Sequence, residues 1–244
     1  MGNIHHIYLH GLLGDETEFN QVIDYFQKIK IKHHRLKIET PKKGENFEQY
    51  IPKLFNQIKN LNITGKVNLV GFSMGGRLAF YLKYYYPKYF NQVIIISSQI
   101  ICQEDIALRK EVDRTRLDDV SNEAELKEWA KKFFMLDIYG SFHTTLSCHQ
   151  KIDSLRYSDL TRYQLLFNQL SVTQQPEIKL DNLSWQNQVL FISGETDKKY
   201  SELAKNYQQL LPMARFEQVT NCAHALHLER PKRLAEIIIE NIIF

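Results

Sequence analysis

The sequence predicts an α/β protein in which a mostly parallel sheet is flanked by helices. Short apolar, β-branched runs alternate with amphipathic stretches, a rhythm typical of parallel sheets covered on both faces. This alternation stops between residues 102 and 184, where the sequence has helical spacing only. At 244 residues the chain is long enough for one domain with an inserted subdomain. We therefore expect a core of residues 1–101 and 185–244, with a helical cap of residues 102–184 inserted between two strands.

Six segments have the composition of buried strands. Each is short, rich in Val, Ile or Leu, and separated from the next by polar or helical sequence. The predicted strands are residues 4–10, 33–39, 66–72, 92–98, 188–194 and 215–220.

Helices are predicted between these strands. Phe19, Ile23 and Phe26 recur at i, i+4 and i+7 and would form one buried helix face. Residues 46–61 repeat this spacing, and a helix that includes Arg77 is expected to end at Pro87. The cap is expected to contain helices within residues 104–117, 123–140 and 158–172.

Composition and charge argue against several classes of function. The chain has 31 basic and 28 acidic residues, a formal charge of only +3 and no long basic block, so we expect no nucleic-acid partner. The first residues lack a signal-peptide pattern and the apolar runs are too short to cross a bilayer. We therefore expect a cytoplasmic protein without a membrane partner. Cys102, Cys148 and Cys222 are widely spaced and odd in number, which favours reduced thiols.

The segment LVGFSMGGR places Ser73 between Gly71 and Gly75, where a predicted strand passes into a predicted helix. A Gly-x-Ser-x-Gly pattern alone is weak, because a serine in such a turn can simply cap the helix. The strand and helix on either side predict instead a sharp turn that exposes the hydroxyl at the carboxyl end of the sheet. Ser73 is therefore predicted to be catalytic.

A catalytic serine needs a base and an acid that orients the base. In this architecture they follow the serine in the order acid then histidine, each after a strand. Asp197 and His224 satisfy that order, with Glu195 and His227 as neighbouring alternatives. We prefer Asp197 because it lies further into its loop, and His224 because it precedes the last helix.

Two backbone amides are expected to stabilise negative charge beside Ser73. Met74 follows the serine and supplies the first amide. The second is assigned to Leu12 in the segment HGLLG, residues 10–14. His10 of the same segment is expected to shape this loop rather than to act as the base.

The segments HGLLG, GFSMGG, GETD and AHALHLERP occur in this order and together resemble the α/β-hydrolase superfamily over nearly the whole chain. The resemblance implies an α/β-hydrolase fold with a helical cap. Membership of so large a superfamily says little about the reaction.

The arginines make the resemblance more specific, because they point to one family within this superfamily. Arg77 lies four residues after Ser73, so its guanidinium can reach the pocket and bind a carboxylate bidentately. The alternative is an exposed arginine in a weak surface ion pair. Together with EDIALR, ending at Arg109, LR, ending at Arg156, and GETDKKY, the motifs resemble the 2-succinyl-6-hydroxy-2,4-cyclohexadiene-1-carboxylate synthases of menaquinone biosynthesis.

That resemblance implies a lyase that eliminates pyruvate from 2-succinyl-5-enolpyruvyl-6-hydroxy-3-cyclohexene-1-carboxylate. It implies a Ser73–His224–Asp197 triad, no metal and no organic cofactor. The expected partner is therefore a small tricarboxylate molecule, and the protein is expected to be a monomer or a homodimer.

The resemblance also implies which residues bind the substrate. Arg77, Arg109 and Arg156 are the expected carboxylate ligands, with three rivals for the two cap positions: Arg114, Arg116 and Arg162. The rest of the expected substrate-binding set is His10, Phe72, which replaces a common tyrosine, and Phe142, a stand-in for a cap tryptophan.

Two other functions remain open. A carboxylesterase, thioesterase or carbon–carbon bond hydrolase of this fold would use Ser73 as a nucleophile. A non-catalytic member would only bind a ligand. Several inward arginines favour the lyase, because buried carboxylates need cationic partners.

Overall fold

The structure is a computed structural model that describes residues 3–26, 29–101, 105–181 and 183–243. Within these ranges six strands form one sheet, in the order β2-β1-β3-β4-β5-β6, and all neighbouring strands are parallel. The strands are β1 (Ile4–Leu9), β2 (Ile31–Leu36), β3 (Lys66–Phe72), β4 (Gln92–Ile96), β5 (Val189–Gly194) and β6 (Arg215–Val219). The predicted α/β class and parallel sheet are confirmed.

The strand order changes direction beside β1. The chain passes from β1 to β2 on one side and then to β3 on the other. Leu9 of β1 pairs with Gly71 of β3, and Gly71 pairs with Ile95 of β4. The loops that follow β1 and β3 therefore leave the sheet side by side, at the switch point where ligands bind in open parallel sheets.

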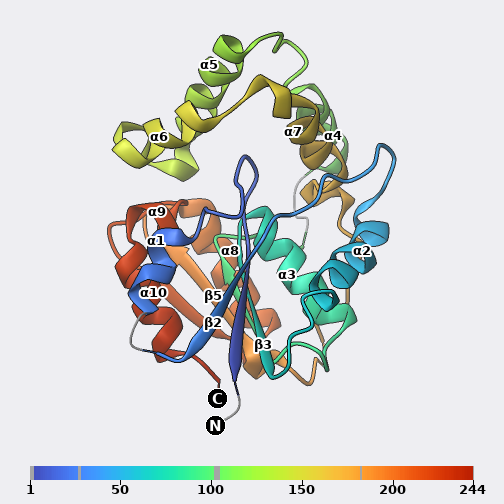
Figure 1. Ribbon diagram of the computed structural model, residues 1–244, viewed down its shortest axis with the longest axis vertical. Coiled ribbons are helices and arrows are strands. Elements are labelled where there is room, and N and C mark those ends of the chain that lie inside the picture. Colours follow the sequence, from blue (N-terminus) through green and yellow to red (C-terminus); the bar gives the residue numbers. More distant parts are fainter. Residues whose placement is uncertain (1–2, 27–28, 102–104, 182, 244) are drawn as a thin grey trace.

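Helices cover both faces of the sheet (Figure 1). Apolar side chains of α2, α3 and α8 pack on one face, and those of α1 and α10 pack on the other. Sequence signals account for the ends of two of them: a capping box of Asn46 and Gln49 begins α2, and Pro231 begins α10. The core helices are α1 (Asn20–Ile23), α2 (Phe47–Lys59), α3 (Met74–Tyr85), α8 (Lys198–Leu210), α9 (Leu226–Glu229) and α10 (Pro231–Glu240).

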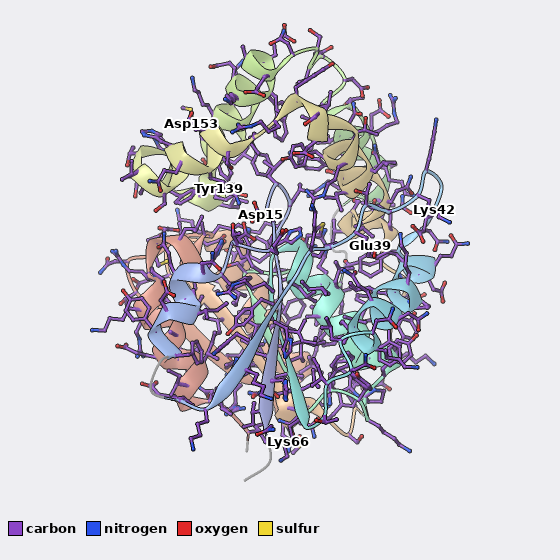
Figure 2. The ribbon with its side chains drawn as sticks, in the orientation of Figure 1. Asp15, Glu39, Lys42, Lys66, Tyr139 and Asp153 are labelled. Atoms are coloured by element: carbon purple, nitrogen blue, oxygen red, sulfur yellow. The ribbon has the colours of Figure 1, made fainter. Side chains whose placement is uncertain are left out.

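Four more helices lie between β4 and β5 in the described chain and sit above one end of the strands (Figure 1). Lys66, the first residue of β3, lies at the far end of the strands, whereas Tyr139 lies near the opposite end, below these helices (Figure 2). The cap thus covers the carboxyl ends of the strands. Its helices are α4 (Ile106–Thr115), α5 (Glu123–Phe134), α6 (Leu146–Ser154) and α7 (Leu160–Gln169).

Short 3₁₀ turns complete the secondary structure. They are η1 (Asp24–Phe26), η2 (Asp137–Tyr139), η3 (Phe142–Thr144), η4 (Tyr157–Asp159), η5 (Val172–Gln174) and η6 (Gln186–Gln188). Each helix in the described ranges is too short or too polar to cross a membrane.

Several predicted boundaries differ from the structure. The strand predicted at 33–39 is Ile31–Leu36, because β2 is an edge strand whose outer side tolerates polar residues that hide its start. The helix α6 was not among the predicted cap helices; its start is marked only by Thr145, whose hydroxyl accepts a hydrogen bond from the amide of Cys148. Cys102 and the predicted boundaries at residues 1, 102 and 244 lie outside the described residues.

Candidate active site

Ser73 lies in the sharp turn between β3 and α3. Its backbone has φ 50° and ψ −111°, a conformation that costs energy for a residue with a side chain. The turn is possible because a Cβ at Gly71 would lie 2.3 Å from the carbonyl oxygen of Gly75, and one at Gly75 would lie 2.0 Å from that of Leu9. The amide of Ser73 donates to the carbonyl of Ile96 at 2.9 Å. These contacts hold the strained serine at the carboxyl end of β3, below the cap.

The structure brings the three predicted triad residues together. Oγ of Ser73 is 3.3 Å from Nε2 of His224, and Nδ1 of His224 is 2.8 Å from Oδ2 of Asp197. The other carboxylate oxygen of Asp197 accepts from the amide of Tyr200 at 3.3 Å, and so caps α8. Asp197 is fixed by this cap, and it can in turn fix the tautomer and orientation of the imidazole.

The imidazole of His224 is almost completely buried among aromatic rings. Its centroid is 4.6 Å from that of Tyr200, 5.1 Å from Phe72 and 5.2 Å from Tyr139. The backbone amide of His224 donates to the carbonyl of Ile138 at 3.1 Å, so the cap also holds this residue. Rings that exclude water strengthen the interaction of the imidazole with the carboxylate.

The neighbouring alternatives for the triad face elsewhere. Glu195 is exposed and accepts from the amide of Asn221 at 2.9 Å. His227 is buried with its ring 4.2 Å from that of Phe72, and its Nε2 is 3.6 Å from the carboxylate of Glu18. Neither residue is placed to replace Asp197 or His224.

The two predicted amide donors border the serine. Leu12, in the loop after β1, and Met74, the first residue of α3, line the same cavity as Ser73. The amide of a first helical residue has no acceptor within its own helix, and the helix dipole favours negative charge there. The arrangement is suited to stabilising an oxyanion or enolate beside Oγ of Ser73.

A cavity of about 470 Å³ lies between core and cap directly above Ser73. This volume falls in the range of small-molecule binding pockets. Among its described lining residues four are cationic, namely Arg77, Arg109, Arg116 and Lys199, and two are acidic, Asp113 and Asp137. The excess of positive charge suits an anionic ligand.

Arg77 contacts the cap from the core. Its Nη2 donates to the carbonyl of Leu170 at 2.6 Å, whereas its Nε is buried and has no hydrogen-bond partner among the described residues. Burial lowers the pKa of Arg77, and Tyr200 partly offsets this effect. An arginine that lines a cavity with an unsatisfied N–H group can bind a carboxylate there.

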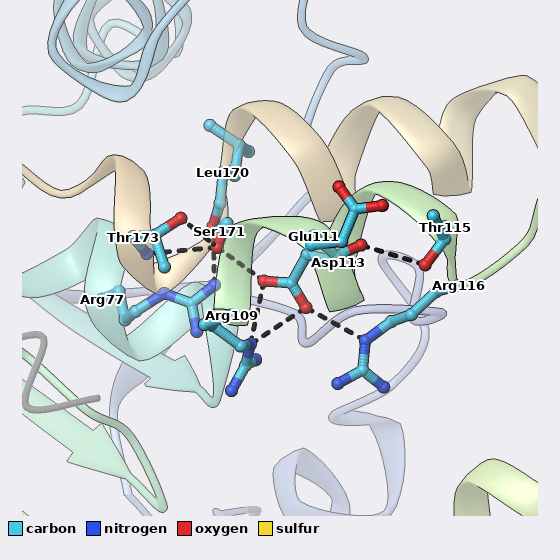
Figure 3. Close-up of polar contacts among 9 residues, drawn as sticks. All are labelled: Arg77, Arg109, Glu111, Asp113, Thr115, Arg116, Leu170, Ser171 and Thr173. Carbon is cyan, nitrogen blue, oxygen red and sulfur yellow. Dashed lines mark hydrogen bonds and ion pairs between the residues drawn. The ribbon is translucent and has the colours of Figure 1, made fainter. Parts of the chain in front are cut away.

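Asp113 of α4 joins two arginines of the cavity wall (Figure 3). Nε of Arg109 is 3.0 and 2.9 Å from its two carboxylate oxygens, and Nε of Arg116 is 3.0 Å from one of them. The hydroxyl of Ser171 donates to the same carboxylate at 2.6 Å. Because Ser171 follows Leu170, all three arginines are linked to the end of α7.

Arg116 is further held by aromatic rings. Its guanidinium carbon lies 5.9 Å from the ring centroid of Phe133 and 5.4 Å from that of Phe167, within the range of cation–π interactions. Arg116 was only a rival in the sequence prediction. Its spacing from Arg109, seven residues along one helical segment, is the signal that would place both on one face.

Arg156 does not reach this cavity as the described residues form it. It follows α6, and its Nη1 donates to the carbonyls of Asp153 and Leu155 at 2.6 and 3.0 Å. Two rival arginines also lie elsewhere. Arg114 is exposed and pairs with Glu111 at 2.7 Å, and Arg162 contacts the loop after β1.

His10 and Phe142, also predicted to bind substrate, have structural positions. Nδ1 of His10 is 2.8 Å from the carbonyl of Gly11, and its Nε2 accepts from the amide of Ile38 at 3.2 Å. Phe142 is buried in the apolar cluster of the cap, with its ring centroid 5.7 Å from that of Phe134. The described cavity wall includes Phe72 but neither of these two residues.

Comparisons with known proteins identify the fold family and several relatives of this chain. The α/β-hydrolase fold family model matches residues 9–231. A Haemophilus influenzae protein provisionally named 2-succinyl-6-hydroxy-2,4-cyclohexadiene-1-carboxylate synthase is 27% identical, covering 97% of this chain and 96% of that protein. A Bacillus subtilis protein with the same provisional name is 24% identical over 78% of this chain and 69% of its own length.

The structure of MenH from S. aureus has the same fold, with a TM-score of 0.83 and 19% identity over 99% of this chain and 94% of that one. The chain therefore belongs to the α/β-hydrolase fold family.

Proposed function

We propose that this protein is a lyase that eliminates pyruvate from 2-succinyl-5-enolpyruvyl-6-hydroxy-3-cyclohexene-1-carboxylate and so forms 2-succinyl-6-hydroxy-2,4-cyclohexadiene-1-carboxylate. The names of the relatives and the motifs of the chain support this reaction. The observation that carries the proposal is the excess of cationic over acidic side chains, four against two, among the described residues that line the cavity with Ser73.

The charge of the cavity matches the proposed substrate. That molecule has carboxylates on its succinyl arm, on its ring and on its enolpyruvyl group, and burying them without cations would be costly. Arg77 lies on the core side, whereas Arg109 and Arg116 lie on the cap side. Cations that come from core and cap and meet at the end of α7 can together bind the carboxylates of one ligand, which an ester with an apolar acyl chain would not need.

The proposed reaction begins with proton transfer. His224 takes the proton of the Ser73 hydroxyl, and Oγ removes the acidic C–H proton next to the succinyl ketone. The electron pair of that C–H bond passes to the ketone oxygen, which the amides of Leu12 and Met74 stabilise. Asp197 stabilises the imidazolium that forms.

Elimination then completes the reaction. The enolate electrons form a new ring double bond, the existing double bond moves along the ring, and the bond between ring carbon and enolpyruvyl oxygen breaks. The leaving group takes up a proton at carbon and becomes pyruvate, while Ser73 and His224 return to their starting protonation states. No acyl-enzyme forms, which distinguishes this reaction from hydrolysis by the same residues.

The decisive experiment supplies the purified protein with the enolpyruvyl substrate and follows diene absorbance and pyruvate together. Both should appear at equal rates, and Ser73→Ala should lower kcat by at least about 10³-fold. Ser154→Ala, at the end of α6, is the control and should be unchanged.

Other outcomes would reject the lyase. A stoichiometric burst of product from a p-nitrophenyl ester, without pyruvate release from the enolpyruvyl substrate, would indicate a hydrolase that uses Ser73 as a nucleophile. Binding of the tricarboxylate without turnover of either compound would indicate a ligand-binding protein.

A further inference from the structure

A buried carboxylate contacts the loop that borders the predicted active site. Glu18, between β1 and α1, has a side chain that is only 1% exposed, yet the proposed reaction does not use it. Its Oε2 accepts a hydrogen bond from the amide of Gly11 at 2.6 Å. Its Oε1 accepts one from Nζ of Lys151 at 2.6 Å. Short bonds to a charged acceptor are stronger than neutral ones, so both contacts constrain the groups they join.

The loop after β1 is built around this carboxylate. A Cβ at Gly14 would lie 2.6 Å from Oε2 of Glu18, so the loop approaches the acid as closely as a glycine permits. Between the two glycines that contact Glu18, Leu13 has a positive φ of 59° and Leu12 lines the cavity. Fixing Gly11 and Gly14 against Glu18 therefore fixes the backbone of Leu12, whose amide is the proposed donor.

Lys151 comes from the cap, on α6, and its side chain is 14% exposed. It supplies the positive charge that a buried carboxylate requires. Burial alone would raise the pKa of Glu18, but Lys151, followed by His227 and His10, holds that pKa well below its usual range. The acid is thus ionised when the cap lies on the core. Asp15, in the same loop, marks this junction of core and cap in Figure 2.

We propose that Glu18 is a positioning residue that holds the loop of residues 10–14 so that the Leu12 amide faces Ser73, with Lys151 of the cap as its required counter-ion. The cap would then do more than cover the substrate, because one of its lysines completes the oxyanion-stabilising site. This inference rests on the proposed role of Leu12.

The test measures oxyanion stabilisation without the proposed substrate. A fluorophosphonate probe reacts with an activated serine: the Oγ–phosphorus bond forms, fluoride leaves, and the serine proton passes to the histidine. The developing charge on the phosphoryl oxygen lies where the amides of Leu12 and Met74 can stabilise it. The maximal inactivation rate and the half-saturating probe concentration are measured for each variant, with Tm as a check on folding.

Four variants decide the question. Glu18→Gln, which keeps an acceptor but removes the charge, should lower the maximal rate at least about tenfold and leave the half-saturating concentration within about twofold. Lys151→Met should lower the rate at least about threefold, whereas Lys151→Arg should keep it within about twofold. The control Lys131→Met removes an exposed ion pair of α5 with Glu128 and should change nothing.

Normal inactivation rates for Glu18→Gln and Lys151→Met, even with a lower Tm, would overturn the inference. If Glu18→Gln does not fold, the difference between Lys151→Met and Lys151→Arg decides instead, and equal rates would overturn it. Absence of probe labelling at Ser73 in the unmodified protein would also overturn it. Labelling without pyruvate release, together with the expected variant pattern, would reject the lyase and retain the inference.

Discussion

Ser73 and His224 lie 151 positions apart in the chain, yet Oγ of Ser73 is 3.3 Å from Nε2 of His224. Both residues follow strands of one parallel sheet, and the cap covers the carboxyl ends of these strands. The loop that carries His224 also bonds to the cap at Ile138 and to the Asp197 carboxylate. The predicted centre therefore depends on loops after three strands, and each can be tested separately.

Replacing Asp197 should reduce turnover rather than binding. The carboxylate contacts Nδ1 of His224 but lies outside the cavity wall that the structure describes. Asp197→Asn can keep the cap of α8 while losing the charge, and we expect kcat to fall by about 10³- to 10⁴-fold with little change in KM. Steady-state pyruvate release measures both constants. Glu195→Gln, on the exposed neighbour, is the control, and an equal loss there would contradict the assignment.

Removal of Arg77 should weaken substrate binding and also slow the reaction, because its guanidinium lies one helical turn beyond Ser73. A charged hydrogen bond contributes about 1.5–3 kcal/mol. We therefore expect Arg77→Ala to lower kcat/KM by at least about tenfold. Arg156→Ala is the matched control, because Arg156 bonds to its own loop. An equal loss at Arg156 would show that this arginine also binds the substrate, as the sequence predicts.

The two neighbouring arginines of the first cap helix segment should behave differently. Arg116 lines the cavity and is held by Asp113, whereas Arg114 forms an exposed pair with Glu111. Arg116→Ala should raise KM at least about tenfold, and Arg114→Ala should leave it within about twofold. Equal KM values would remove Arg116 from the substrate site.

The turn at Ser73 should not tolerate a side chain at Gly75. The added Cβ would lie 2.0 Å from the backbone oxygen of Leu9, which cannot move without disturbing β1. We expect Gly75→Ala to unfold the protein or to lower its free energy of unfolding by more than about 3 kcal/mol. Gly44→Ala, which has open space but a positive φ, should cost only about 1 kcal/mol. Urea unfolding compares the two, and similar costs would contradict the packing argument.

A buried histidine should make stability depend on pH. Burial, reinforced by His33, lowers the pKa of the His6 imidazole to about 3. The unfolded chain binds a proton below its ordinary pKa of about 6.5, while the folded ring stays neutral. The contribution of the neutral His6 ring to the free energy of unfolding is thus fully present above about pH 6.5 and is lost as the pH falls towards 3.

The expected loss at about pH 5 is roughly 2 kcal/mol from this ring. Urea unfolding at about pH 7 and pH 5 measures it. His6→Phe should show a smaller difference between the two pH values, whereas His149→Phe, on the exposed side of α6, should not. An unchanged difference in His6→Phe would contradict the assignment.

Sequence patterns located a strand best where the composition of that segment alone indicates burial on both faces. The strand predicted at 66–72 coincides with β3, because six of its seven residues are buried and most of these are apolar, as in a strand covered on both faces. The edge strand β2 was misplaced, since only its first and last residues, Ile31 and Leu36, are apolar and buried, so the strand has no continuous apolar run. Arg156, predicted from a two-residue match, lies outside the described cavity wall, because so short a match does not define the direction of a side chain.

The sequence alone determined the local chemistry: a strand, a serine between glycines and a helix that carries Arg77 one turn later. Steric limits and helical periodicity act over a few residues, so these features can be recognised without a structure. Only the tertiary structure decided that Asp197 rather than Glu195 contacts His224, that Arg116 joins Arg109 around Asp113, and that Glu18 contacts Lys151. Those choices depend on how loops and cap helices pack across long stretches of chain, which no short pattern encodes.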